Sequence, residues 1–238
     1  AGYVFSGATV QSLFSPAPAA GDQLGWSVAT AGGLRAVGSP HVTTNGLGHA
    51  GAVYVFGGGT TRMLAAPTPS AGDYFGWSLA GDAGSIVVGA PSVDSGSVAD
   101  AGAAYVFDAG TGALRRTLTA PTPFAYAQLG YAVAVSGSRV VAGAPYDGTD
   151  VAAPGRAYVF DATSGALVRT LDSPRNRTGE AFGQAVAIDG TRVLVGAPYD
   201  GTVGSNAGAV YVYDLTSDAA PLRLTSPRDV VANHRFGS

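Results

Sequence analysis

Several residue types that commonly build chemical sites are missing or scarce in this chain. It has no cysteine, which excludes disulfides, thiolate metal sites and cysteine nucleophiles together. The only glutamate is Glu180, and the only imidazoles are those of His41, His49 and His234. Neither a Gly-x-Ser-x-Gly segment nor a His-Glu-x-x-His segment occurs. The sequence therefore contains no recognisable catalytic motif.

Charge is also scarce, at 12% of the residues and a formal net charge of −3. All thirteen basic residues are arginines, and they are scattered singly except at Arg115 and Arg116. Nucleic acids and anionic membrane surfaces demand clustered cations, so we expect neither as a partner. No run of eighteen apolar residues occurs, which argues against membrane insertion. The N-terminus does not resemble a signal peptide, so a targeting signal is either absent or already removed.

What the chain does contain is a tandem repeat of about 53 residues. The segment Gly-Ala-Val-Tyr-Val-Phe at 51–56 recurs, with small changes, at 102–107, 155–160 and 208–213, and in shortened form at 2–5. An apolar residue followed by glycine stands at 24–25, 75–76, 129–130, 182–183 and 236–237. Gly-Ser/Ala-Pro stands at 38–40, 89–91, 143–145 and 196–198. The three markers keep phase along the whole chain.

Each repeat reads as four short strands separated by turns rich in glycine, proline and aspartate. The strands are like 77–80, 86–88, the Tyr-Val-Phe segment, and 114–118. This pattern predicts an all-β protein, a β-propeller built from four-stranded antiparallel blades. A β-solenoid is the alternative. As one domain over 1–238, the chain divides into a partial blade at 1–23, four blades at 24–74, 75–128, 129–181 and 182–235, and the start of another at 236–238.

The combined markers resemble the FG-GAP repeat family, clearest at Phe182-Gly183, Gly196-Ala-Pro198 and the segment 208–213. Similar repeats form the propeller of integrin α-subunit heads and occur in many secreted or cell-surface microbial proteins. The resemblance implies adhesion or recognition at an extracellular or cell-surface location. It also implies a ring of about seven blades. The unfinished blades at both ends could share a blade and close a ring of about five blades, but they favour a segment of a larger propeller or one whose remaining blades come from elsewhere.

The sequence departs from the integrin-type repeat at the link between the first two strands. That repeat carries a calcium loop there, whereas the links at 31–33, 81–84, 136–138 and 189–191 supply at most one carboxylate each. Calcium needs six to eight oxygen ligands. We therefore expect the variety that lacks the calcium loop, with no metal and no cofactor.

Functional residues are expected in the links between strands two and three and between blades, which the resemblance places on one face of a propeller. Candidates in the first kind of link are Tyr146, Asp147, Asp150, Tyr199 and Asp200. Their carboxylates could bind a cation or a sugar hydroxyl, with the tyrosines as stacking platforms. Alternatively, Asp-Gly simply builds a tight turn.

The links between blades contain Phe124, Tyr126, Arg175 and Arg177. Exposed aromatic residues and arginines are typical anchors of protein interfaces. The alternative is that the aromatic residues cap the core and the arginines are solvated. Asn176 begins an Asn-x-Thr sequon and could carry a glycan if the chain is exported.

Two further patterns carry less information. His41 and His49 share one loop, but a metal site would need a third ligand. The glycines from Gly46 to Gly51 match the dinucleotide-binding pattern by letter, but they precede a strand rather than open a helix.

Taken together, the sequence predicts a non-enzymatic extracellular or cell-surface propeller that binds a protein or glycan through loops on one face. The alternatives are a structural subunit of a surface assembly or filament that self-associates, and a carbohydrate-binding lectin. A propeller hydrolase or lyase is a further alternative, because a fold does not fix a function.

Overall fold

The computed structural model describes residues 2–6, 9–148, 153–226 and 234–238, and strands are the only regular elements in these ranges. They form one two-stranded sheet and four four-stranded sheets. The two-stranded sheet pairs β1 (Gly2–Ser6) with β2 (Thr9–Leu13). No helix that could cross a membrane is found in the described ranges.

The four larger sheets are antiparallel meanders in which each strand pairs with its neighbour in the chain. This confirms the predicted all-β fold of four-stranded blades. The first contains β3 (Val28–Ala31), β4 (Leu34–Ser39), β5 (Ala52–Gly57) and β6 (Thr60–Leu64). The second contains β7 (Ser78–Gly81), β8 (Ser85–Ala90), β9 (Ala103–Asp108) and β10 (Leu114–Leu118). The third contains β11 (Ala132–Ser136), β12 (Arg139–Ala144), β13 (Arg156–Asp161) and β14 (Leu167–Asp172). The fourth contains β15 (Val186–Asp189), β16 (Arg192–Ala197), β17 (Ala209–Asp214) and β18 (Leu222–Leu224).

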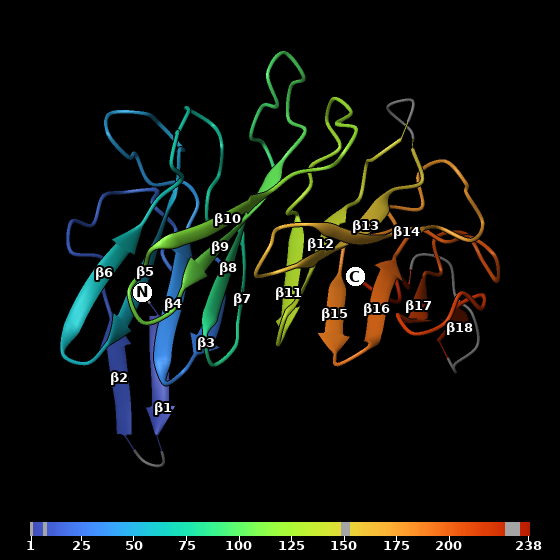
Figure 1. Ribbon diagram of the computed structural model, residues 1–238. Coiled ribbons are helices and arrows are strands. Elements are labelled where there is room, and N and C mark those ends of the chain that lie inside the picture. The colour runs from blue at the N-terminus through green and yellow to red at the C-terminus, as the bar shows by residue number, and fades with distance from the viewer. Residues whose placement is uncertain (1, 7–8, 149–152, 227–233) are drawn as a thin grey trace.

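These sheets are arranged as the blades of a propeller, side by side in chain order (Figure 1). Their first strands are neighbours in space, because β3 contacts β7, β7 contacts β11 and β11 contacts β15. The long links between sheets and the loops after β4 and β8 lie at the upper end in Figure 1, which we call the loop face. The short turns between first and second strands lie at the opposite end.

The core consists of equivalent apolar layers between consecutive sheets. Between the first and second sheets, Val53 and Val55 pack with Phe75 and Tyr105. Between the third and fourth sheets, residues at the same repeat positions meet, such as Val159 with Phe182. Each layer removes these side chains from water, which is the main favourable contribution to stability. The repeat therefore encodes not only a sheet but also the contact with the next sheet.

Glycine is required where the backbones of neighbouring sheets meet. A Cβ atom built on Gly143 would lie 1.9 Å from the carbonyl oxygen of Gly183 in the next sheet. Gly155 has a φ of +89°, and its Cβ would lie 2.2 Å from the carbonyl oxygen of Phe182. Residues of all three repeat markers thus meet at each junction between sheets. This shared contact explains why the spacing between the markers is kept from repeat to repeat.

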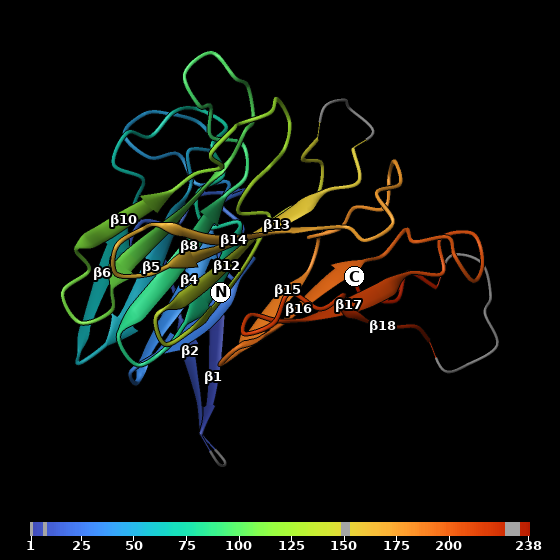
Figure 2. The same cartoon turned by 45° about the vertical axis from the view of Figure 1, so that its right-hand side comes forward.

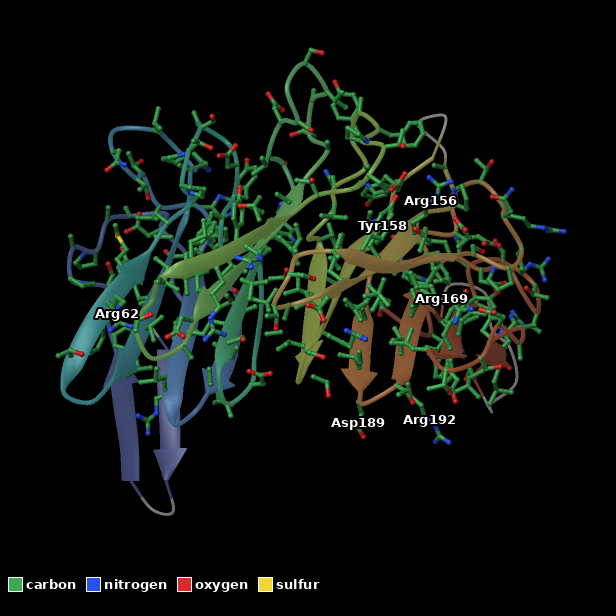
Figure 3. The ribbon with its side chains drawn as sticks, viewed as in Figure 1. Arg62, Arg156, Tyr158, Arg169, Asp189 and Arg192 are labelled. Atoms are coloured by element: carbon green, nitrogen blue, oxygen red, sulfur yellow. The ribbon has the colours of Figure 1, made fainter. Side chains whose placement is uncertain are left out.

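Arginines on fourth strands add polar links between sheets. Arg62 donates to the carbonyl oxygen of Gly110 at 3.0 Å, and Arg169 donates to that of Ser217 at 2.7 Å. Figure 3 labels both arginines. Each reaches a turn of the following sheet, so the outer strands are tied together as well as the inner ones.

The far face of the fourth sheet differs from its equivalents because it is exposed. Leu194 is 37% exposed and Leu224 is 39% exposed. At the same positions of the third sheet, Val141 is 0% and Leu171 1% exposed, because the fourth sheet covers them. Figure 2 shows the fourth sheet extending outward from β15 to β18. We call the surface formed by Leu194, Val210, Val212, Leu222 and Leu224 the open face.

Candidate functional site: an aromatic groove on the loop face

Three large aromatic side chains form a row beside the first strands of the first three sheets. Trp26, Trp77 and Tyr131 each follow the glycine of an apolar-Gly marker, just before a first strand. Consecutive first strands are neighbours, so the rings are too. The ring centroids of Trp26 and Trp77 are 4.8 Å apart, and those of Trp77 and Tyr131 are 5.7 Å apart. The propeller thus converts one repeat position into a continuous row.

Further rings support and extend this row. Tyr74 packs against Trp77 with centroids 6.1 Å apart, and His41 packs against Trp26 at 5.8 Å. Tyr146, a residue predicted from the sequence, continues the row beyond Tyr131 at 6.5 Å. These edge-on and tilted contacts hold the rings in place while leaving some ring surface accessible.

The row borders a groove with a volume of about 530 Å³. Besides aromatic rings, amide and hydroxyl groups line it, and within the described part of the chain no Asp, Glu or Arg belongs to the lining. The lining residues are Gln23, Trp26, His41, Tyr74, Trp77, Pro91, Ser92, Gln128 and Tyr131. Apolar walls with a few polar groups are typical of ligand sites.

The histidines beside the groove form a close pair. The Nδ1 atoms of His41 and His49 are 3.0 Å apart, so one must donate and the other accept. Desolvation and the neighbouring His49 lower the pKa of His41, which favours the neutral ring. No cluster of three or more potential metal ligands occurs among the described residues.

Gln23 and Gln128 occupy the same repeat position, directly before the apolar-Gly marker. Both have a left-handed backbone, with φ of 53° and 57°. Tyr74 has the same conformation at its repeat position, and so does Ala181. The backbone amide of Gln128 donates to the carbonyl oxygen of Asp100 at 3.1 Å, which ties the link to the adjacent loop. The repeats therefore share the backbone conformation at this position but differ in the residue that occupies it.

The structure corrects the prediction that Asp147 and Asp200 present their carboxylates to a partner. Both are fully buried beneath their loops. Asp147 accepts a hydrogen bond from the hydroxyl of Tyr158 and pairs with Arg156 at 3.1 Å. Figure 3 labels Arg156 and Tyr158 near the loop-face end of β13. Burial raises the pKa of Asp147, and Tyr158 and Arg156 oppose that rise.

Asp200 pairs with the equivalent tyrosine one repeat later, but with an arginine from the fourth strand β18 instead of the third. The Tyr211 hydroxyl donates to it at 2.6 Å, and Arg223 donates at 3.1 Å and 3.2 Å. Burial opposes its ionisation, yet hydrogen bonds from Thr202, Tyr211 and Arg223 lower the pKa of Asp200 to about 2. Recurrence at both positions identifies a scaffold feature: a buried carboxylate that fixes the loop to its sheet.

The other candidates in these loops have different surroundings. Tyr146 is 40% exposed and belongs to the aromatic row. Tyr199 is half-buried and is covered by the Arg235 guanidinium, 5.2 Å from its ring centroid. Asp150 lies outside the described residues.

The predicted residues in the links between blades do not line the groove. The Arg156 guanidinium lies 5.9 Å from the ring centroid of the half-buried Phe124, whereas Tyr126 is 53% exposed. Arg175 lies 3.6 Å from the buried Glu180, which also accepts from Ser173 at 2.6 Å. Two neighbouring residues, Asn176 and Arg177, are exposed.

Trp26, Trp77 and Tyr131 are not among the site residues predicted from the sequence, although a signal for them exists. When the repeats are superposed on the apolar-Gly marker, an aromatic residue follows the glycine in the first three full repeats and Gln184 in the fourth. The exposure of this position depends on the neighbouring sheets, so it is apparent only once the sheets are placed around their axis.

Comparisons with known proteins agree with this fold. A family model described as the FG-GAP repeat matches residues 9–56, 60–107, 114–160 and 176–213, well over half of the chain. No curated protein matches the sequence. Among solved structures, the computationally designed Ika8 protein is similar, with a TM-score of 0.53 and 19% identity. The similarity covers 87% of this chain and 50% of that chain, so this chain spans about half of the designed protein.

Proposed function

The chain belongs to the FG-GAP repeat family, and from this premise we propose that it is a non-enzymatic recognition module outside the cell or on its surface. FG-GAP repeats indicate a propeller-type interaction domain. The partner is a protein or glycan, bound at the loop face through the aromatic groove.

The aromatic groove is the observation that carries this proposal. Trp26 is 48% exposed, although water contact with so large an apolar side chain is unfavourable. Its neighbours Trp77 and Tyr131 are also partly accessible. Tryptophan and tyrosine are enriched at the energetic centres of interfaces. A contiguous exposed aromatic surface bordered by polar residues is typical of an interaction site.

The buried carboxylates support the non-enzymatic part of the proposal. Catalytic acids and bases usually have perturbed pKa values and lie in a cleft. Asp147 and Asp200 have shifted pKa values, but their oxygens are engaged by tyrosine and arginine side chains. These two groups therefore serve the scaffold.

Binding to an array of extracellular proteins and surface glycans tests the proposal. We expect the chain to bind selectively and the double variant Trp26→Ala/Trp77→Ala to lose that binding. Phe14→Ala is the matched control, because Phe14 is 65% exposed but does not line the groove. Equal binding by the double variant and the unmodified chain would refute a role for the groove.

The open face favours a second candidate function, that of a subunit in a surface assembly. Leu222 is 64% exposed there, beside Leu194 and Leu224. Exposed apolar sheet faces promote association. In this case the partner is another copy of the chain.

A further inference from the structure

We propose that the aromatic groove is a saccharide site that binds a neutral glycan. This inference rests on the proposed recognition function and specifies the chemical class of its partner. It depends on the charge of the lining, the arrangement of the rings, and the hydrogen-bonding capacity of the polar groups.

The absence of charge in the lining favours an uncharged ligand. Among the residues that the structure describes, no Asp, Glu or Arg lines the groove. Among the described residues of the lining, His41 is the one basic side chain, and desolvation and the neighbouring His49 lower its pKa, which favours the neutral ring. Sialylated, sulfated or phosphorylated ligands are recognised by arginine or lysine, which pair with the anion. Such ligands would meet no cationic side chain to pair with among the described residues of the lining.

The rings provide platforms for the apolar faces of sugars. Trp26, Trp77 and Tyr131 form a row with centroid separations of 4.8 Å and 5.7 Å. The faces of aromatic rings carry a negative electrostatic potential, which attracts the partly positive hydrogens of C–H groups. One face of a pyranose presents several C–H groups together. A row of rings therefore suits an oligosaccharide, whose successive sugars can each contact a ring.

The polar groups of the groove match hydroxyl groups better than a peptide backbone. The amides of Gln23 and Gln128 and the hydroxyl of Ser92 can each donate and accept hydrogen bonds. Sugar hydroxyls have the same dual capacity. A proline-rich peptide, the other ligand typical of aromatic grooves, offers carbonyl acceptors but few N–H donors. It would leave the amide oxygens unpaired.

The site is also held in place before a ligand arrives. Ring contacts fix Trp77 between Trp26 and Tyr131, and Tyr74 packs against it. The backbone at Gln128 is fixed by its hydrogen bond to Asp100. A preformed site loses less conformational entropy on binding.

The test uses the full chain on a glycan array that carries neutral, sialylated and sulfated oligosaccharides. Titration calorimetry with the best neutral oligosaccharide then gives its dissociation constant. We expect neutral glycans to bind and Trp77→Ala to weaken binding about tenfold or more. Gln128→Met should also weaken it, because the variant keeps the shape of the side chain but cannot hydrogen-bond. Phe14→Ala should bind as the unmodified chain does.

Circular dichroism and melting temperature establish that each variant is folded. Gln128 is only partly buried, so Gln128→Met keeps the test decisive even if Trp77→Ala unfolds. Absence of any neutral glycan among the bound spots would overturn the inference.

A proline-rich peptide that competes for the groove and binds equally well to Gln128→Met would also overturn the inference. That result would leave the proposed recognition function intact, because the groove would still be the binding site. Loss of the recognition function has a different signature: proteins and glycans would bind the Trp26→Ala/Trp77→Ala variant as well as the unmodified chain.

Discussion

At the scale of single residues, the repeat is defined by close backbone contacts. Gly143 and Gly155 stand where neighbouring sheets approach each other closely, and a side chain at either position would collide with a carbonyl oxygen. The aromatic row depends on this closeness, because it brings one first strand beside the next.

Gly143→Ala should therefore destabilise the fold by about 1–3 kcal/mol, since the new methyl group forces the third and fourth sheets apart. Gly84→Ala is the matched control, because a Cβ there meets nothing within 4 Å. Thermal unfolding of both variants checks the prediction. Equal melting temperatures would show that the junction has room for a side chain.

The Asp200 carboxylate makes the free energy of unfolding depend on pH. Its pKa falls from about 3.8 to about 2 on folding, so the unfolded chain binds the proton more tightly. The resulting stabilisation, ~2 kcal/mol, is present above pH 4 and is lost as the pH falls towards 2. Melting temperatures should show Asp200→Asn losing less stability than the unmodified chain across this interval. A constant difference between the two proteins would contradict this assignment.

At the scale of elements, the strands were predictable because their pattern is local. The segment 114–118 coincides with β10, and the Tyr-Val-Phe segments lie in β5, β9 and β13. Short apolar runs bounded by glycine and proline leave little else for such segments to form. The buried carboxylates were less predictable, since Asp-Gly suits a turn whichever way the aspartate points. Burial of Asp147 and Asp200 depends on tyrosines one strand away.

Equivalent residues in the third and fourth sheets differ in burial, so the same substitution should have different effects on stability. Val141 is completely buried, whereas Leu194 lies on the open face. Val141→Arg should cost about 4 kcal/mol or more, because it buries an unpaired charge. Leu194→Arg should change the free energy of unfolding by less than about 1 kcal/mol. Chemical denaturation measures both, and a large loss in Leu194→Arg would show that the open face is covered.

At the scale of the whole molecule, the propeller gathers separate repeats into two distinct surfaces. The loop face carries the aromatic groove, and the far side of the fourth sheet is apolar. The groove is not visible in a single repeat, because it combines residues of several sheets around the axis, whereas the open face belongs to the fourth sheet alone.

Analytical ultracentrifugation tests the second of these surfaces. If the open face associates with another copy, the average mass should rise with concentration, and Leu194→Arg should reduce that rise. A monomer at every concentration would argue against the assembly function without affecting recognition at the loop face.

Intrinsic fluorescence reports on the groove most directly, because both tryptophans of the chain, Trp26 and Trp77, lie in it. Titration with a neutral oligosaccharide selected on the array should give a saturable change in emission as the rings leave water. Its midpoint should match the calorimetric dissociation constant. Saturated binding without any change in tryptophan emission would place the ligand elsewhere and contradict a recognition site in the aromatic groove.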